Sequence, residues 1–171
     1  MSRRLPSYLL ALGIVCLLAA CGFQLRGVGG AATLPQGWEK MYLVTGNPNG
    51  EFSQAVRTVF TTNGVQWAAS ADANYSLILG PDKFTQTNLS LNREARVSQF
   101  ELTMQTTFSV LDASGKEVMP DTTASVMRQM ENDPRNVMGK GQELRILQSE
   151  MRTELAQQMI RRIGFFASSR Q

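Results

Sequence analysis

The segment 99–110 constrains the fold more than any other part of the sequence. Along it, apolar side chains and one threonine alternate strictly with polar side chains. Successive side chains of a β-strand point to opposite faces, so this pattern predicts a half-buried strand. The face expected to be buried consists of Phe100, Leu102, Met104, Thr106, Phe108 and Val110. The opposite face is rich in threonine and glutamine, which suits either plain solvation or hydrogen bonds to a polar protein surface.

Weaker patterns on both sides of this segment predict the remaining elements. Strands are expected over 41–44, 75–89 (with an interruption at Pro81) and 118–130, and a hairpin turn over 112–115. Helices are expected where apolar residues recur at helical spacing, along the stripes Phe52, Ala55, Val56, Val59, Phe60 and Leu144, Leu147, Met151, Leu155, Met159, Ile163. The first helix should end at Asn63-Gly64 and the second at Gly164.

The order strand, helix, three strands, helix predicts an α+β fold. We expect two helices packed on one face of a four-stranded, mostly antiparallel sheet. The first two strands could be parallel, because a helix connects them. The predicted organisation is a leader over 1–20, an N-terminal tether over 21–36, a single domain over 37–166 and a short tail over 167–171.

The first twenty residues are typical of a secretory signal rather than of a folded element. Arg3 and Arg4 precede an apolar run over 8–18, and small residues follow it. The run is short for a membrane span, which needs about 20 apolar residues. The alternative, an uncleaved anchor helix, is disfavoured by the polar and glycine-rich stretch that follows directly.

Cys21 is the only cysteine outside the apolar leader. Alone in an exported chain, it cannot form an internal disulfide. The stretch Leu18-Ala19-Ala20-Cys21 resembles the lipobox of bacterial lipoproteins, in which cleavage falls before the cysteine and its thiol takes a diacylglycerol. Gly22, rather than aspartate, follows Cys21, and by resemblance to sorted lipoproteins this points to the outer membrane. Several acyl chains on one residue would anchor the protein durably.

The composition argues against most kinds of catalysis. The sequence has no histidine and no usable thiol, so Ser-His and Cys-His nucleophilic sites are excluded. We therefore expect no enzyme activity, no catalytic residue, no metal site and no cofactor. A pair of catalytic carboxylates remains open in principle, although nothing in the spacing of the acids brings two of them together: Glu51, Asp72, Asp82, Glu94, Glu101, Asp121, Glu131 and Asp133. The formal charge of +3 falls to about +1 without Arg3 and Arg4, so nucleic-acid binding is not expected.

Two short segments carry cations that could bind phosphate. Arg93 and Arg96 lie in the turn between the second and third expected strands, where guanidinium groups could grip a phosphate. Arg135 and Lys140 precede or begin the last helix, where the helix dipole mildly disfavours a cation. The alternative for all four is an ordinary exposed cation in solvent.

Several motifs together resemble the LptE family of LPS-assembly lipoproteins. The mature N-terminus Cys21-Gly22-Phe23-Gln24-Leu25-Arg26-Gly27 is similar to the start of these proteins. Looser matches follow at Asn47-Pro48-Asn49-Gly50, Ser53, Ala55-Val56-Arg57, over 75–110, and at Asn132-Asp133-Pro134. Family members with a long polar C-terminal tail differ from this sequence, which stops at Gln171 soon after the last expected helix.

This resemblance implies an α+β domain that lodges in the lumen of the large β-barrel LptD and is lipid-anchored at the periplasmic face of the outer membrane. It implies a heterodimer that inserts lipopolysaccharide (LPS) into the outer leaflet. It also implies LPS contact by Arg93 and Lys140, with Arg96 and Arg135 as further candidates for LPS or barrel contact. An alternative from another class is a stand-alone tethered lipid carrier or assembly factor in the periplasm.

Overall fold

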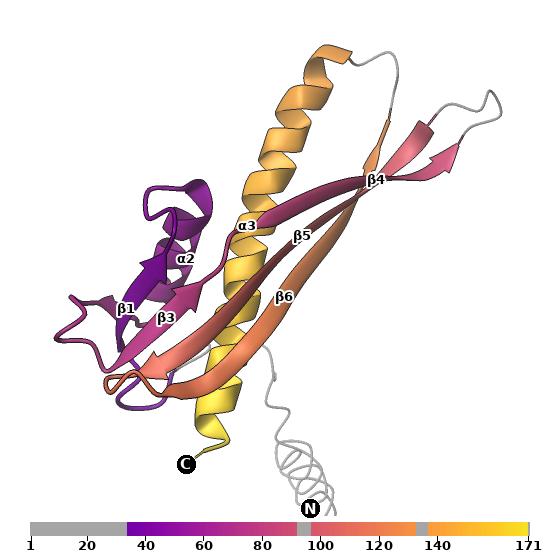
Figure 1. Cartoon of the computed structure of the whole chain (residues 1–171). Coiled ribbons are helices and arrows are strands. Elements are labelled where there is room, and N and C mark those ends of the chain that lie inside the picture. The colour runs from indigo at the N-terminus through magenta and orange to yellow at the C-terminus, as the bar shows by residue number, and fades with distance from the viewer. Residues whose placement is uncertain (1–33, 92–96, 133–136, 171) are drawn as a thin grey trace, which may run out of the picture. The chain divides into compact units, whose positions relative to one another are not determined.

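The computed structural model describes residues 34–91, 97–132 and 137–170 of the chain. These residues belong to one compact unit. Its elements are β1 (Lys40–Thr45), α2 (Glu51–Thr62), β2 (Gln66–Trp67), β3 (Tyr75–Leu79), β4 (Lys83–Leu91), β5 (Val97–Asp112), β6 (Glu117–Glu131) and α3 (Val137–Ser168). The α+β class is therefore confirmed (Figure 1).

The long strand β5 organises the sheet. It pairs antiparallel with β6 along one edge, and antiparallel with β4 and then β3 along the other. Beyond β3, the strands β1 and β2 continue the sheet in parallel. The parallel pairing of β1 with β3 across the α2 connection agrees with the expectation from the sequence.

The expected four-stranded, mostly antiparallel sheet was wrong in detail, because the described residues form a mixed sheet of six strands. The expected strand over 75–89 is divided into β3 and β4 at Gly80-Pro81. Proline has no N–H to donate to the ladder, so the strand is interrupted there, while the Gly80 N–H still donates to the Thr107 carbonyl at 2.9 Å. The strand β2 was missed because two residues are too few to show a period.

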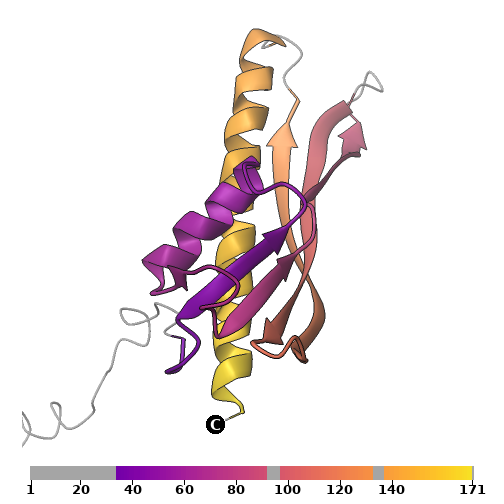
Figure 2. The ribbon, with the colours of Figure 1, turned by 60° about the vertical axis from the view of Figure 1, so that its left-hand side comes forward.

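Both helices cover the same face of the sheet (Figures 1 and 2). The alternation expected for β5 is confirmed on this face, where Leu102 and Met104 are fully buried, whereas Gln105 and Thr107 on the opposite face are exposed. The helices add the stripes predicted for them, including Val56 and Phe60 from α2 and Met151, Leu155, Met159 and Ile163 from α3. All of these side chains belong to one hydrophobic core.

The predicted ends of the elements had different outcomes. The end of α2 is confirmed, because Gly64 follows it with a φ of +93° that favours glycine. The hairpin is also confirmed, with Asp112 accepting hydrogen bonds from the N–H groups of Ser114 and Lys116. The prediction that α3 ends at Gly164 was wrong: the helix continues to Ser168, and Gly164 is buried inside it. Neither α2 nor α3 is long and apolar enough to cross a membrane.

Candidate functional site

At one end of the domain lie the ends of the strands and of the helix that neighbour, in the sequence, the predicted phosphate-binding cations. Here β4 ends, β5 begins, β6 ends and α3 begins, and the backbone register pairs Leu91 with Val97 and Gln99 with Glu131. We call this end of the domain the tip. The described residues that flank the segments 92–96 and 133–136 belong to it. The topology thus brings together elements that lie up to 49 positions apart, from Leu91 to Lys140.

Lys140 is the predicted site residue at the tip whose side chain the structure describes. It lies in the first turn of α3 and is half-buried. Its ammonium group donates a hydrogen bond to Oδ1 of Asn132 and lies 4.3 Å from the centre of the Phe100 ring. No carboxylate of the described residues forms an ion pair with it. The ammonium is therefore held by a neutral amide and an aromatic face, which leaves its positive charge uncompensated by these contacts.

Arg93, Arg96 and Arg135 lie outside the described residues, as does Cys21. Their roles in phosphate binding and lipidation stay predictions. The structure does describe the strand and helix ends that flank these arginines in the sequence. Those strand and helix ends belong to the tip.

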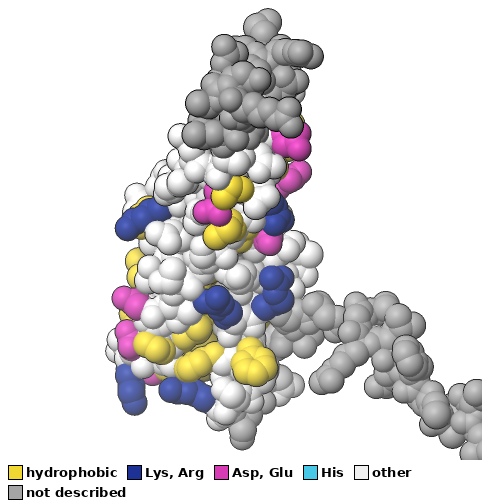
Figure 3. Space-filling model, turned by 90° about the vertical axis from the view of Figure 1, so that its right-hand side faces the viewer, with side chains coloured by type: hydrophobic (Ala, Val, Ile, Leu, Met, Phe, Trp, Pro, Cys, Tyr) yellow, Lys and Arg dark blue, Asp and Glu magenta, His cyan; other side chains and the backbone are white. Residues whose placement is uncertain are grey.

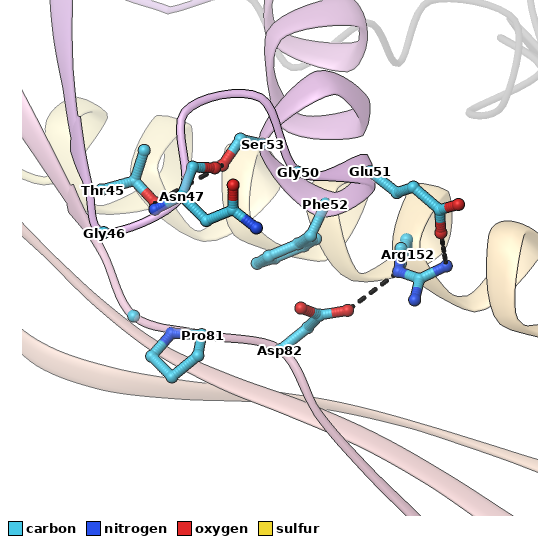
Figure 4. Close-up of a pocket in the computed structure, with 11 residues that line it drawn as sticks. Thr45, Gly46, Asn47, Gly50, Glu51, Phe52, Ser53, Pro81, Asp82 and Arg152 are labelled. Atoms are coloured by element: carbon cyan, nitrogen blue, oxygen red, sulfur yellow. Dashed lines mark hydrogen bonds and ion pairs between the residues drawn. The ribbon is translucent and has the colours of Figure 1, made fainter.

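A pocket of about 390 Å³ lies between α2, α3 and the junction of β3 and β4 (Figure 4). Arg152 of α3 closes one side of it. Its Nε donates to Asp82 Oδ2 at 2.8 Å, and its Nη1 donates to Glu51 Oε2 at 2.6 Å. On the other side, the Ser53 hydroxyl donates to the Asn47 carbonyl at 2.7 Å.

The charged side chains that line this pocket are bound to one another in ion pairs and are not free to act as reactive groups. Two of the acids considered as a catalytic pair, Glu51 and Asp82, do meet here, but both are bound to the Arg152 guanidinium. The guanidinium is correspondingly engaged by two carboxylates and is not available as an anion site. Sequence reasoning missed this cluster because Arg152 is 70 and 101 positions away from its partners, a separation at which no pattern signals contact.

The sheet face opposite the helices is mainly polar and exposed. Neighbouring strands align their threonine, serine and glutamine side chains there, since Gln105 lies opposite Ser125 and Thr107 lies opposite Thr123. Lys83, Glu101 and Glu131 bring charges to the same face, and Met127 is an exposed apolar side chain on it. Among the described residues, no group of three acidic, cysteine or histidine side chains could hold a metal ion.

Comparison with known proteins identifies the family to which this architecture belongs. The family described as LptE, lipopolysaccharide-assembly, matches residues 38–163. The LPS-assembly lipoproteins LptE of Yersinia pestis (strain Pestoides F) and Yersinia pseudotuberculosis serotype O:1b (strain IP 31758) are each 27% identical over 166 residues, covering 95% of this chain and 77% of the relative.

Solved structures share the fold at low sequence identity. Lipoprotein B from Nitrosomonas europaea superposes with a TM-score of 0.70 at 23% identity, covering 86% of this chain and 94% of that one. Rare lipoprotein B from Shewanella oneidensis gives 0.67 at 23% identity, covering 76% and 97%. These likenesses establish the fold, whereas the family match extends over nearly all of the described domain. The chain therefore belongs to the LptE family of lipopolysaccharide-assembly lipoproteins.

Proposed function

We propose that this protein is an outer-membrane lipoprotein that lodges in the lumen of the LptD β-barrel, stabilises it and binds LPS as it is inserted into the outer leaflet. The observation that carries the proposal is the family match over residues 38–163. The family is one of assembly lipoproteins and is not a known enzyme family, so the protein acts by binding rather than by catalysis.

The polar face of the sheet supports a place inside a barrel. The lumen of an outer-membrane barrel is polar, whereas its outer surface is apolar. The exposed hydroxyl and amide side chains of this face can form hydrogen bonds with such a wall. Exposed uncharged polar side chains on this face include Thr85, Thr87, Gln105, Thr107, Thr123, Ser125 and Gln129.

The tip supports direct LPS contact. LPS carries phosphates on its lipid A, and the Lys140 ammonium lies next to a neutral amide and an aromatic ring rather than in an ion pair with a described carboxylate. Inside a narrow lumen the effective dielectric constant is lower than at an open surface, so cations attract phosphates more strongly. Arg93 is the second expected LPS ligand, and Arg96 and Arg135 would add charge at the same end.

Charge reversal tests this assignment. We expect Lys140→Asp and Arg93→Asp each to weaken LPS binding about tenfold, the loss of roughly one strong charge contact. Lys40→Asp is the matched control, because Lys40 is an exposed lysine at the start of β1, at the opposite end of the domain from the tip. Unchanged LPS affinity in the tip variants, or an equal loss in the control, would remove both residues from the site.

Co-purification tests the partner. A tagged copy should retain a large β-barrel when outer membranes are solubilised in detergent. If no barrel co-purifies, a place in its lumen is wrong.

The alternative of a stand-alone lipid carrier needs an apolar cavity between the sheet and the helices. In the described residues that space is occupied by one continuous core, which includes Leu102, Met104, Met151 and Met159, all fully buried. The packing therefore favours the barrel-bound role over a carrier.

A further inference from the structure

The C-terminal end of α3 presents an exposed aromatic residue that neither the core nor the tip accounts for. Phe165 is 83% exposed, the highest value among the large hydrophobic residues described as exposed. It borders a shallow hollow of about 430 Å³ with Met119 of β6 and with Phe166, Arg161 and Arg162 of α3. We call these five residues the C-terminal patch. Figure 3 shows hydrophobic side chains gathered with Lys and Arg toward the lower end of the molecule, where α3 ends.

The α3 side of this patch carries only positive charges. Residues 155–170 contain Arg161, Arg162 and Arg170 and no acidic residue. The Arg170 guanidinium lies 4.6 Å from the centre of the Phe166 ring, and Arg162 donates to the Thr123 carbonyl of β6. On the β6 side, the exposed acids Glu117 and Asp121 lie two positions before and after Met119. An exposed phenylalanine flanked by arginines matches a surface that is apolar inside and negatively charged outside.

The patch lies at the same end of the domain as the start of β1, which follows the predicted N-terminal tether. The register places Met41 beside Tyr75, Tyr75 beside Asp112, and Val110 beside Met119, so the start of β1 and the patch share one end of the sheet. Figures 1 and 2 both show the start of β1 at the same end as the C-terminus of α3.

The tether is short enough to keep this end close to a membrane. Twelve residues, 22–33, separate Cys21 from Leu34, which packs against the core. Fully extended, they reach at most about 45 Å. A lipid on Cys21 would therefore hold the Leu34 end of the domain within a few tens of ångströms of the bilayer.

We propose that the C-terminal patch rests on the anionic phospholipid surface next to the lipid anchor, with Phe165 inserted at the headgroup level and the arginines against lipid phosphates. The proposal rests on the lipid anchor that forms part of the proposed function. An acyl anchor at Cys21 would restrain distance but not orientation. A second contact at Phe165 fixes the direction of α3, so that the tip points away from the periplasmic leaflet.

Vesicle flotation tests the contact without the anchor. The mature chain with Cys21→Ser, which retains every described residue, should float with vesicles of phosphatidylethanolamine and phosphatidylglycerol and much less with phosphatidylcholine alone. Phe165→Ser should lower the partitioning into vesicles about tenfold, because the aromatic side chain that would insert into the bilayer is lost. Arg161→Gln should lower it about fivefold, since each cation near an anionic surface adds a similar factor. Added salt should weaken the binding.

Ile146→Ser is the matched control, because Ile146 is a 52% exposed apolar residue on the same helix but far from the patch. No flotation of the Cys21→Ser chain without further substitution, or an equal loss in the control, overturns the proposal. Loss of barrel co-purification by Phe165→Ser without any change in flotation also overturns it, because the patch would then bind protein. Mass spectrometry of the mature N-terminus tests the anchor separately, so a missing lipid on Cys21 and a non-binding patch give different results.

Discussion

Arg152 joins three elements that are remote in the sequence, and we expect its loss to destabilise the whole domain. From α3 it binds Asp82 at the start of β4 and Glu51 at the start of α2 (Figure 4). Arg152→Met keeps most of the apolar stem of the side chain and removes the charge and its donors. The substitution therefore isolates the ionic contribution from packing.

The two ion pairs should contribute unequally. The side chains of Arg152 and Asp82 are only 19% and 25% exposed, so the charged hydrogen bond between them is shielded from water and Asp82 would lose its partner in a half-buried place. A hydrogen bond to a charged group contributes about 1.5–3 kcal/mol. The Glu51 side chain is 80% exposed, so its pair should contribute less than about 0.5 kcal/mol. We expect Arg152→Met to lower the free energy of unfolding by about 2 kcal/mol, almost all of it through Asp82.

Urea denaturation followed by circular dichroism measures this loss. A change of this size should lower the midpoint by about 1 M urea for a domain of this size. A double-mutant cycle with Asp82→Asn should give a coupling energy above about 1 kcal/mol, and a cycle with Glu51→Gln should give almost none. Equal coupling in both cycles, or a cost of Arg152→Met below about 0.5 kcal/mol, would refute the reasoning from burial.

Two further predictions concern the sheet. A Cβ atom at Gly80 would lie 2.8 Å from the Thr107 carbonyl oxygen, so Gly80→Ala should cost about 1–3 kcal/mol in thermal or urea unfolding, whereas Gly46→Ala, with nothing within 4 Å, should be nearly neutral. The Ser114 hydroxyl and backbone N–H groups in the hairpin lower the pKa of Asp112 below its ordinary value. Its stabilising effect is therefore present above that ordinary value and is lost as pH falls through the lowered pKa. Titration by NMR should show the lowered pKa, and Ser114→Ala should raise it toward the ordinary value; an unchanged pKa in that variant would assign the shift to other groups.

The features that were predicted well from the sequence depend on local patterns, such as buried residues that recur at regular spacing along a strand or helix. The alternation in β5 and the stripe of α2 each reflect a single buried face, and Gly64 marks a backbone conformation that favours glycine. The features that it missed depend on long-range contact or on context. Gly164 looks like a helix end in the sequence, but it is buried within α3, which continues past it to Ser168.

The same distinction applies to the sites. Lys140 was singled out by residue type and by family resemblance, and the structure places it at the tip. The roles of Arg93, Arg96 and Arg135 stay predictions. Arg152 and Phe165 carry no local signature. One is recognised by partners in remote elements and the other by exposure, and both properties exist only in the folded chain.

The length of α3 links the two ends of the molecule. Lys140 and Phe165 are 25 positions apart on this helix, which corresponds to a rise of about 37 Å. The hydrocarbon core of a bilayer is about 30 Å thick. In the arrangement proposed above, with Phe165 at the periplasmic leaflet and α3 along the barrel axis, this rise would place Lys140 at the level of the opposite leaflet. Since Arg152 fixes α3 against α2 and β4 between these two points, the separation of tip and patch is a property of the packed domain as a whole.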